Sequence, residues 1–397
     1  MAAPALRRYL DASATTPPAP EVLAAMEAAA PRAWANPSSL HGWGLEAAEL
    51  LERSRQSLAL GLGADPRQLI LCSGGSEAIH LALLGSAALM EPGRVLLSAV
   101  EHPATESAAR LLSRGGWQVE RLPVDRQGRL DPETLARRLD PPTRLVSLIW
   151  GQNEVGTLQP IEAIGHRCRA AGVLLHVDAV QVLGHRPIDL ANLPVDLLSG
   201  AAHKLQGPRG IGLLALAEGV RLAPLIGGGG QEGGRRGGTE AVLLAHGFAT
   251  ALDLARTRLA RHGGLDPLLS LRDGLWRQLQ GLEGIRLSGA DPDDPDARLP
   301  HHLSVLISDH SGQPLSGRAL VRGLARRGWA VSSGSACSQG GSGERPSAVL
   351  MAMGFGEREA TSGLRFSLGP WLREADLDGF ALDLEAVCRE LAAAGAP

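Results

Sequence analysis

The stretch IEAIGHRCRAAGVLLHVD (residues 161–178) places a helical pattern directly before an apolar run of strand length. Residues 161–171 have the pattern of a helix, and Leu174–Asp178 has that of a strand. Apolar runs of this kind alternate with helical patterns from about residue 20 to residue 255. This alternation is typical of an α/β fold with an open, mostly parallel sheet. Because the expected strands are almost continuously apolar, we expect helices to cover both faces of the sheet.

The strands expected in this sheet, seven in number, are Gln68–Cys72, Arg94–Ser98, Gln118–Leu122, Leu145–Ile149, Leu174–Asp178, Leu197–Ser199 and Ile211–Ala215. The helices expected between them include Glu77–Ala88, Glu133–Arg138 and Ile161–Ala171.

The pattern changes near residue 255, where a long helical stretch over Leu254–Leu282 is interrupted by Gly263, Gly264 and Pro267. We expect a smaller α+β domain here, with strands near Leu303–Ile307, Trp329–Ser332 and Gly363–Ser367 and helices near Leu315–Arg327, Ala348–Met353 and Leu377–Ala393. The sequence therefore predicts a large domain over residues 12–255. Residues 1–11 and 256–397 are predicted to form the small domain.

Composition excludes several classes of protein. The chain has 397 residues, and no run of about 18 apolar residues exists, so we expect no membrane span. The net charge of −3, with acids and bases interspersed, argues against nucleic acid as a main partner. Four widely spaced cysteines without a CxxC pair argue against a disulfide scaffold or a structural zinc site. Together with the absence of a signal-peptide pattern at the start, they predict a cytoplasmic location.

Lys204 is the sole lysine of the chain, and every other basic residue counted with it is an arginine. It ends the segment LLSGAAHK (197–204), in which small residues follow an apolar strand. An amine can lose its proton and attack a carbonyl, whereas a guanidinium stays charged. Ligands of α/β sheets bind beyond the carboxyl ends of the strands. Lys204 is therefore a candidate for a Schiff base with an aldehyde cofactor, and an ordinary surface lysine is the alternative.

Two further segments end strands of the same sheet. In CSGGSE (72–77), the glycines and the free amide groups of a helix start favour an anion, although an ordinary capped helix has the same pattern. In HVDAVQ (176–181), Asp178 ends a buried strand, where a protonated pyridine nitrogen would keep its carboxylate charged. Gln181 is placed to reach a ring hydroxyl. A helix N-cap is the alternative for Asp178.

Four more residues have side chains suited to chemistry or recognition. His102 follows a strand and is suited to stacking on a ring and moving protons. Asn153 can donate to a carboxylate or to a phenolic oxygen. Arg365 lies within an apolar strand, where a buried guanidinium needs an anion such as a substrate carboxylate. Cys337, among Ser and Gly residues, has the setting of an exposed reactive thiol. The glycine-rich loop over 227–239 is either a linker or backbone threaded past a ligand or partner subunit.

Taken together, these segments resemble the cysteine desulfurases, in the NifS/IscS-like branch of the class V aminotransferases, which are fold-type I pyridoxal-phosphate (PLP) enzymes. The matching motifs keep their order over nearly the whole chain: YLDASATTP (9–17), NPSSLHGWG (36–44), SGGSE (73–77), EHPA (101–104), QNEVG (152–156), HVDAVQ (176–181), HKLQGPRG (203–210), RRGGT (235–239), SSGSAC (332–337) and LRFSLG (364–369).

This resemblance implies roles for individual residues around PLP. Lys204 would bind the cofactor covalently, and His102 would stack on its ring and move protons. Asp178 would pair with the ring nitrogen, and Gln181 with the ring hydroxyl. The phosphate would be held by Gly75, Ser76 and His203, with Thr239 reaching it from the other subunit of a homodimer.

The resemblance also implies the substrate side and the reaction. Asn153, next to the cofactor, and Arg365 would bind the carboxylate of L-cysteine. Cys337 would attack the substrate sulfur, leaving alanine and a persulfide. The persulfide would pass to an acceptor or scaffold protein for iron–sulfur cluster or thio-cofactor assembly. No metal is implied.

The chain departs from the family at three places. Ala201 stands where the family has a phosphate-binding Ser, which removes one hydrogen bond, worth roughly 1–2 kcal/mol. Gly75-Ser76 replaces the usual Ala-Thr and keeps the hydroxyl. The loop after Cys337 has extra glycines, so acceptor specificity stays open.

Two alternatives to a desulfurase also stay open. One is a cysteine or cystine C–S lyase, or a selenocysteine lyase, in which Cys337 is dispensable. The other is an inactive scaffold for sulfur-transfer partners. The sequence does not decide which acceptor takes the sulfur, or whether selenocysteine or cystine is preferred.

Overall fold

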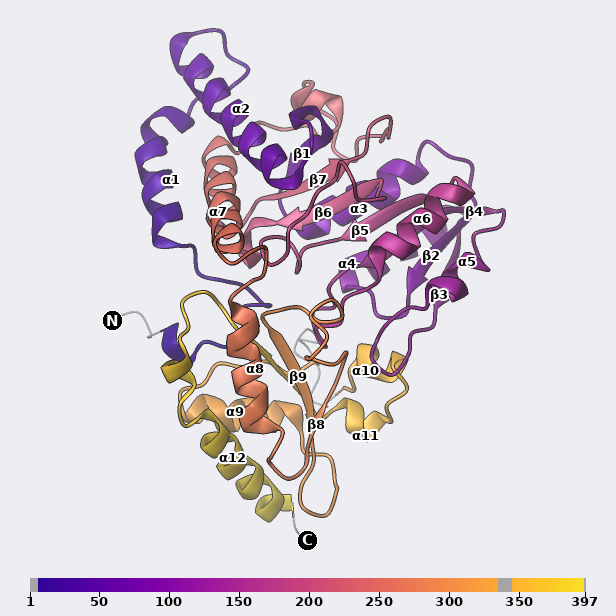
Figure 1. The fold of residues 1–397 in the computed structure, drawn as a ribbon. Coiled ribbons are helices and arrows are strands. Elements are labelled where there is room, and N and C mark those ends of the chain that lie inside the picture. The colour runs from indigo at the N-terminus through magenta and orange to yellow at the C-terminus, as the bar shows by residue number, and fades with distance from the viewer. Residues whose placement is uncertain (1–5, 335–344, 396–397) are drawn as a thin grey trace.

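The computed structural model describes residues 6–334 and 345–395 and shows two sheets, one above the other in Figure 1. The larger sheet has seven strands in the order β1-β7-β6-β5-β4-β2-β3. These strands are β1 (Leu69–Cys72), β2 (Arg94–Ser98), β3 (Gln118–Leu122), β4 (Thr143–Ile149), β5 (Leu174–Asp178), β6 (Leu197–Ala201) and β7 (Gly212–Leu216). All seven expected strands are therefore confirmed.

The large sheet is mostly parallel, as predicted. The pairs β2–β3, β2–β4, β4–β5 and β5–β6 are parallel, and β7 is antiparallel to both of its neighbours, β1 and β6. The carboxyl ends of β2, β4, β5 and β6 consequently meet at one edge of the sheet. The segments that follow these strands include those of His102, Asn153, Asp178 and Lys204.

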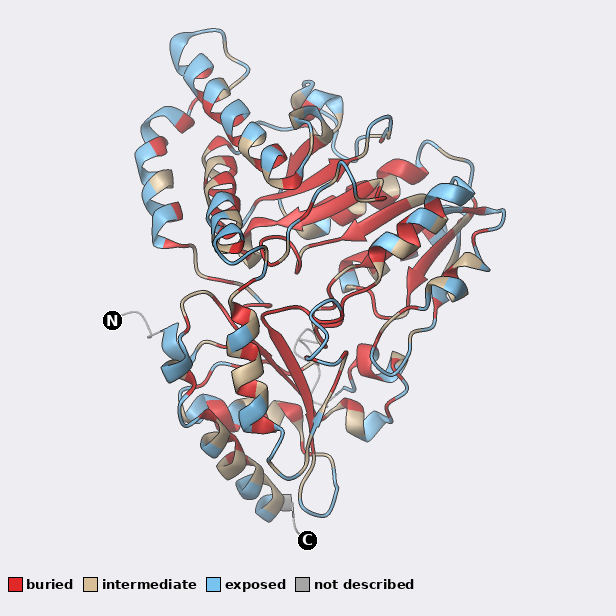
Figure 2. Ribbon diagram, viewed as in Figure 1, coloured by how far each residue is buried: buried red, intermediate tan, exposed pale blue. Residues whose placement is uncertain are grey.

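Helices cover both faces of the large sheet. Leu69 and Leu71 of β1 belong to a core cluster that includes residues of α2, α6 and α7, whereas Ile70 and Cys72 belong to a second cluster built with α3 and α4. Successive residues of a strand point to opposite faces, so each face has its own helical layer. The strands are buried throughout most of this sheet (Figure 2). The predicted two-sided burial is confirmed.

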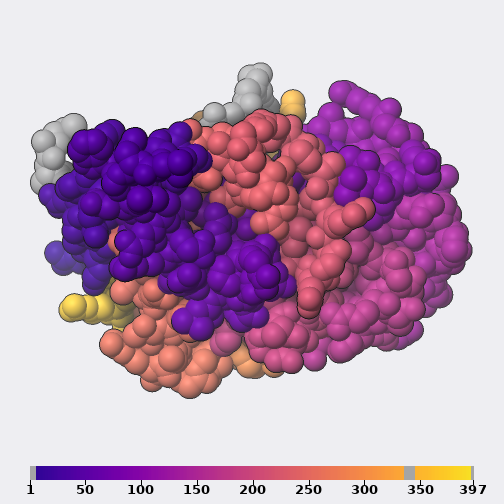
Figure 3. All heavy atoms as spheres, turned by 90° about the horizontal axis from the view of Figure 1, so that it is seen from above, coloured from indigo at the N-terminus to yellow at the C-terminus, as the bar shows by residue number. Residues whose placement is uncertain are grey.

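The helices of this part of the chain are α1 (Pro20–Ala33), α2 (Gly42–Leu62), α3 (Gly75–Ala87), α4 (Pro103–Arg114), α5 (Pro132–Ala136), α6 (Ile161–Ala171) and α7 (Val242–Arg261). Seen from above in Figure 3, the N-terminal region, in indigo, lies beside the salmon-coloured region of α7. The predicted domain boundary at residue 255 falls inside α7, and it stays a prediction.

The smaller sheet is antiparallel, with the order β10-β9-β8. Its elements and the helices around it are α8 (Leu268–Leu279), β8 (Ile285–Leu287), β9 (His302–Ile307), α9 (Gly317–Arg326), α10 (Ala348–Ala352), α11 (Glu357–Ala360), β10 (Gly363–Ser367) and α12 (Phe380–Gly395). The predicted interruption of the long helix is confirmed, since the chain leaves α7 at Arg261 and begins α8 at Leu268.

One expectation for this sheet is wrong, and one of its strands was not expected. Trp329–Ser332 is not a strand of the sheet: it makes only single bridges, from Ala330 to Tyr9 and from Ser332 to Arg365. The short strand β8 was not predicted, because its three residues, Ile-Arg-Leu, are too few to show a period. The hydrogen bonds of residues 329–332 go instead to the N-terminal segment and to β10.

The N-terminal segment joins the two sheets. Leu10 lies in the core cluster around the smaller sheet, and its amide donates to the Ala330 carbonyl. A few residues later, the Thr16 amide donates to the carbonyl of His203, beyond the end of β6. Residues 10–16 therefore cross from the small sheet to the edge of the large one.

Candidate active site

Lys204 faces the N-terminal segment. It ends the short 3₁₀ helix η3 (Ala202–Lys204) directly after β6. Its Nζ donates to the carbonyls of Ser13, at 2.5 Å, and Ala14, at 2.7 Å. The Ser13 carbonyl also accepts from Nε2 of Gln181, at 2.9 Å. The structure thus brings Lys204 and Gln181 to one carbonyl, at a partly buried position where the amine is not simply solvated.

Asp178 is the last residue of β5 and is 3% exposed. One of its carboxylate oxygens accepts from the amide of Val180, at 3.0 Å. Burial raises the pKa of Asp178, while the charges of His102 and Lys204 lower it. These three side chains are therefore close enough to affect one another electrostatically. A cation near the carboxylate would keep it ionised, which suits the protonated nitrogen of a pyridine ring.

His102 is the N-cap of α4, and its Nδ1 accepts from the amide of Ala104, at 3.1 Å. Burial lowers the pKa of His102, Asp178 raises it, and Lys204 lowers it further. The imidazole is thus neutral at pH 7. Because a backbone amide is always a donor, Nδ1 has no hydrogen and the ring hydrogen is on Nε2. His102 accordingly presents a donor at its free nitrogen.

The start of α3 forms a cradle of backbone amides. Gly74 has φ 156° and ψ −178°, a conformation open essentially to glycine alone. A Cβ at Gly75 would lie 2.7 Å from Cγ2 of Val180, so no other residue fits without a shift. The amides of residues 75–77 precede the first α3 bond, from Ala78 to Gly74. They are the donors that an anion takes at a helix N-terminus.

The Ala201 methyl group faces this cradle, 3.7 Å from the point where a Cβ on Gly75 would lie. A serine hydroxyl at residue 201 would therefore lie beside the same amides. The expected loss of one phosphate contact at Ala201 agrees with this position. His203, two residues later, is oriented by the hydroxyl of Thr15, 3.1 Å from its Nδ1. Burial, with Lys204 and Arg209, lowers the pKa of His203 to about 4, so its ring is neutral.

The glycine-rich loop is held against the body of the protein by ion pairs. Glu232 is buried at φ 51°, and its carboxylate accepts from two nitrogens of Arg55, at 2.7 and 2.8 Å. Arg236 pairs with Glu77 in the first turn of α3, at 2.8 Å. This loop is therefore not a free linker. It leads to Thr239, which is exposed and is not drawn into the site of its own chain by any described contact.

Arg365 approaches the site from the small sheet. It lies in β10, 7% exposed, and its Nη2 donates to Oδ1 of Asp11, at 2.7 Å. Its Nη1 donates to the carbonyl of Asn153, at 2.8 Å, and that carbonyl also contacts Nε2 of His302, at 3.2 Å. The Nε of Arg365 is buried and lacks a partner within the described residues. A buried guanidinium with an unused N–H is suited to a carboxylate.

Cys337 lies outside the described residues, so its position is not part of this geometry. The three described cysteines are free thiols, and burial raises their pKa values, to about 12 for Cys72 and Cys168 and about 11 for Cys388. A thiol with such a pKa is hardly ionised at pH 7 and is a poor nucleophile. These three residues therefore do not compete with Cys337 for the role of reactive thiol.

Sequence reasoning missed two acidic residues at the site. Asp11 lies in the quoted YLDASATTP motif, but its pairing with Arg365 bridges more than 350 positions and leaves no local pattern. Glu101, next to His102, is buried, and burial raises its pKa to about 8. One oxygen of Glu101 accepts from the Ser98 hydroxyl and from the Ile149 amide, and the other lacks a partner in the described part of the chain. An acid three residues after the end of the buried strand β2 was the available signal.

Neither a metal site nor a membrane-spanning helix is found in the described part of the chain. Between residues 6 and 395, leaving out 335–344, no group of three His, Cys, Asp or Glu side chains is placed to hold a metal ion. None of the helices in those ranges is long and apolar enough to cross a membrane.

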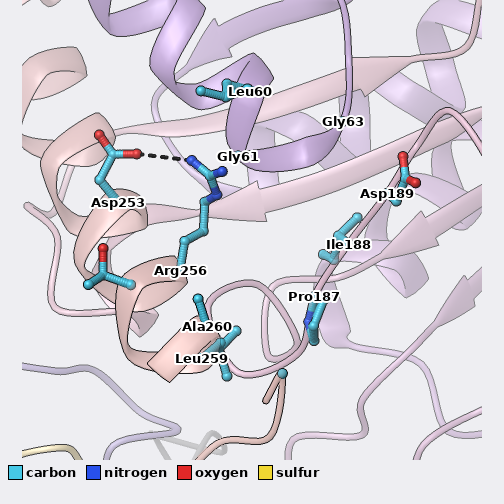
Figure 4. A pocket seen from close by; sticks show the side chains of 12 residues that line it. Leu60, Gly61, Gly63, Pro187, Ile188, Asp189, Asp253, Arg256, Leu259 and Ala260 are labelled. Carbon is cyan, nitrogen blue, oxygen red and sulfur yellow. Dashed lines mark hydrogen bonds and ion pairs between the residues drawn. The ribbon is translucent and has the colours of Figure 1, made fainter. Parts of the chain in front are cut away.

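A groove of about 620 Å³ lies between the end of α2, α7 and residues 187–189 (Figure 4). It contains the Asp253–Arg256 ion pair and none of the predicted site residues.

The residues present fit PLP. The sole lysine suits its aldehyde, the buried Asp178 suits a cationic ring nitrogen, and the amides at the start of α3 suit its phosphate. These features converge on the edge of the large sheet where the strands end, which is where ligands bind in open α/β sheets.

Comparison with known proteins agrees with this geometry. The model of the family described as "Aminotransferase class-V" matches residues 8–380. The chain belongs to this family. It is 36% identical to cysteine desulfurase IscS of Dictyoglomus turgidum, over 96% of this chain and 95% of that protein. It is also 36% identical to cysteine desulfurase NifS of Azotobacter vinelandii, over 96% and 93% of the two chains. A solved NifS-like protein superposes with a TM-score of 0.85 at 32% identity, covering 96% of this chain and 99% of its own. The resemblance to NifS/IscS-like cysteine desulfurases is thereby confirmed.

Proposed function

We propose that this chain is a PLP-dependent cysteine desulfurase, which converts L-cysteine to L-alanine and retains the sulfur as a persulfide on Cys337. The observation that supports this most directly is the position of Lys204. The sole amine side chain lies at the strand-end edge with Asp178 and His102, and Arg365 reaches the N-terminal segment beside it from the small sheet. An amine, a ring-directed carboxylate and a carboxylate-binding arginine are the groups that an amino-acid substrate of a PLP enzyme requires.

When bound, PLP supplies an electron sink that makes the Cα proton of an amino acid acidic. Lys204 would hold its aldehyde carbon, and Asp178 would keep its ring nitrogen protonated, with Gln181 at the ring hydroxyl. The amides of Gly75 and Ser76, together with His203, would hold its phosphate. The neutral state of His203 makes it a hydrogen-bond partner for that phosphate rather than a counter-charge.

Two side chains are placed to hold or move a proton. The Nζ of Lys204, in the basic form, is the group available to take the Cα proton of the substrate. His102 is neutral, and its hydrogen is on Nε2 because Nδ1 is occupied by the Ala104 amide. His102 is therefore suited to donate a hydrogen bond from Nε2.

The sulfur step requires one thiolate and no external oxidant. The Cys337 thiolate attacks the sulfur of the bound cysteine, so an S–S bond forms and the substrate Cβ–S bond breaks. The electron pair of the broken bond goes to the carbon, which takes a proton. L-Cysteine and one enzyme thiol thus give L-alanine and one enzyme persulfide, with atoms and electrons balanced.

We further propose that the enzyme is a homodimer. Several large apolar side chains around α1 and α2 are exposed, among them Leu40 at 90% and Trp43 at 62%. Apolar surface of this kind is usually covered by a partner. The glycine-rich loop ends on exposed Thr239, which supports the expectation that Thr239 reaches the phosphate of the second subunit. Sedimentation velocity would test this: we expect a dimer that Trp43→Asp weakens, and a monomeric wild type would contradict it.

The persulfide would be passed to an acceptor or scaffold protein for iron–sulfur cluster or thio-cofactor assembly, and we propose that this occurs in the cytoplasm. The support for these statements is the cysteine desulfurase family together with the cysteine usage of the chain. A two-protein transfer assay with labelled persulfide would test the acceptor.

The Cys337→Ala variant tests the central proposal. We expect this variant to lose alanine production from L-cysteine while keeping the visible absorbance of the bound cofactor. Cys388→Ala, a thiol distant from the site, is the matched control and should retain both. If Cys337→Ala still forms alanine or releases sulfide at the wild-type rate, the protein is a C–S lyase and the desulfurase proposal is wrong. A colourless purified protein that PLP does not reconstitute would indicate an inactive scaffold.

A further inference from the structure

We propose that Asp11 is a positioning residue for substrate recognition, which holds the Arg365 guanidinium so that its unused N–H groups point at the substrate carboxylate. This inference rests on the proposed function, because it assumes that Arg365 binds an α-carboxylate. It assigns to Asp11 a specific part in selecting amino-acid substrates over amines.

The hydrogen bonds of Arg365 divide into two groups. One hydrogen of Nη2 goes to Asp11, at 2.7 Å, and one of Nη1 goes to the carbonyl of Asn153, at 2.8 Å. A guanidinium has five N–H groups in a rigid plane. Nε is buried without a partner in the described residues. The two contacts therefore fix the plane of the fork while donors remain for a ligand.

Asp11 is itself held by the strand on which Arg365 lies. Asp11 forms a parallel bridge with Ser367 of β10, two residues beyond Arg365. The Ser367 amide donates to the Leu10 carbonyl, and the Ala12 amide donates to the Ser367 carbonyl. The Ser13 amide adds a bond to the Ser367 hydroxyl, at 2.8 Å. Asp11 and Arg365 thus share one rigid frame, so the ion pair orients the arginine relative to its own strand.

The same segment reaches the reactive amine. Ser13, two residues after Asp11, gives its carbonyl to both Lys204 and Gln181. The segment Asp11–Ser13 therefore contacts Arg365 at one end and Lys204 at the other, and links the two side chains in space. An error in the orientation of Arg365 would weaken its bidentate contact with the substrate carboxylate, and the loss would appear as weaker substrate binding.

The ion pair between Arg365 and Asp11 is largely buried, so its charges matter even before a substrate binds. Arg365 is 7% exposed, and its ion pair with Asp11 has side-chain exposures of 8% and 21%. A buried cation without a counter-charge is costly, so Asp11 also keeps Arg365 in place before a substrate arrives. Asparagine at residue 11 would keep an oxygen to accept from Nη2 but no charge. Alanine would remove both.

The test compares two ligands that differ only in a carboxylate. Dissociation constants of L-alanine and ethylamine are measured by calorimetry on the PLP-loaded wild type, Asp11→Ala and Asp11→Asn. We expect Asp11→Ala to weaken L-alanine binding about tenfold to a hundredfold, as loss of an orienting charge-assisted bond would do, and to leave ethylamine unchanged. We expect Asp11→Asn to recover most of the loss. KM for L-cysteine should rise in parallel in Asp11→Ala, with kcat within about threefold of the wild type.

Glu359→Ala is the matched control, because it removes the exposed Glu359–Arg286 ion pair of the same domain. It should leave both dissociation constants unchanged. If Asp11→Ala keeps the wild-type preference for L-alanine over ethylamine, or weakens both ligands equally, the inference is overturned while the desulfurase proposal stands. If the wild type itself binds the two ligands equally, the carboxylate role of Arg365 is wrong, and the inference is overturned with it.

Discussion

The edge of the large sheet and the middle of β10 supply the site in different ways. At the large sheet, Asp178 and Lys204 each stand at or just beyond a strand end, and neighbouring parallel strands bring them together. At β10, Arg365 lies within a strand of the other sheet and depends on Asp11 and on the Asn153 carbonyl for its orientation. The groups proposed to react with the cofactor therefore belong to one rigid layer, whereas the group proposed to bind the substrate is held by contacts from three distant segments.

The largest loss of activity should come from a substitution at the edge of the large sheet. Lys204→Ala removes the sole amine side chain, and we expect L-alanine formation to fall by more than about a thousandfold, because no other residue can take its role as base. The melting temperature should change little, since Lys204 contacts carbonyls that water can also satisfy. The assay is alanine production with saturating L-cysteine. Activity above a few per cent of wild type would show that Lys204 is not the reactive amine.

The next largest effect on the kinetics should come from a substitution of Arg365 in β10. Arg365→Lys keeps the charge but loses the planar fork, so we expect KM for L-cysteine to rise about tenfold to a hundredfold with a smaller change in kcat. Steady-state kinetics measures both constants. Arg286→Lys, in the same small domain, is the control and should match the wild type. An unchanged KM in Arg365→Lys would contradict the role of β10 in substrate binding, and with it the difference between the two regions.

A third prediction concerns Glu101, at the edge of the large sheet, and the pH dependence of the free energy of unfolding. Its folded pKa of about 8 lies above the ordinary value of 4.5, so between these values the folded state binds a proton that the unfolded state lacks. The contribution of Glu101 to the free energy of unfolding should therefore fall as pH rises from 5 to 8, by a few kcal/mol at about 1.4 kcal/mol per pKa unit.

Urea denaturation of Glu101→Gln at pH 5 and pH 8 is the measurement. Glutamine keeps the acceptor for Ser98 and Ile149 without a titrating proton, so we expect the wild type to lose stability relative to this variant as pH rises from 5 to 8. Glu359→Gln, an exposed acid, should behave as the wild type. Equal pH slopes for Glu101→Gln and the wild type would contradict the prediction.

The smallest effect concerns the phosphate cradle. Ala201→Ser places a hydroxyl beside Gly75, and we expect PLP to bind about fivefold more tightly, equivalent to about 1 kcal/mol. Titration of the apoenzyme with PLP measures the dissociation constant. Ala88→Ser, at the exposed far end of α3, is the control. Weaker binding in Ala201→Ser would show that the cradle has no room for the hydroxyl.

The difference between the large sheet and β10 also explains which features could be predicted from the sequence. The seven strands of the large sheet and the position of Lys204 follow from apolar runs and from where they end, because a parallel sheet repeats one local pattern. Arg365 is also predictable, as an arginine in an apolar strand. Asp11 is not, because its partner lies more than 350 positions away in the chain and only folding brings the two together.

Other differences have equally local causes. The expected strand at Trp329–Ser332 is apolar enough, but its hydrogen bonds go to the N-terminal segment and to single positions of β10. The second oxygen of Glu101 is buried without a partner in the described part of the chain, beside Ser98 of β2 and Ile149 of β4, and no short motif records this burial. The roles of Thr239 and Cys337 depend on a second subunit and on residues outside the described ranges, and they stay predictions.

The solitary Lys204 has a practical consequence for studying this protein. Reagents that acylate primary amines have only its side chain and a free chain terminus to modify, because arginine does not react with them. Cross-linking chemistry aimed at amines would therefore leave almost all of the surface unmarked, and contacts with an acceptor protein would have to be mapped with carboxyl-directed or photoreactive probes.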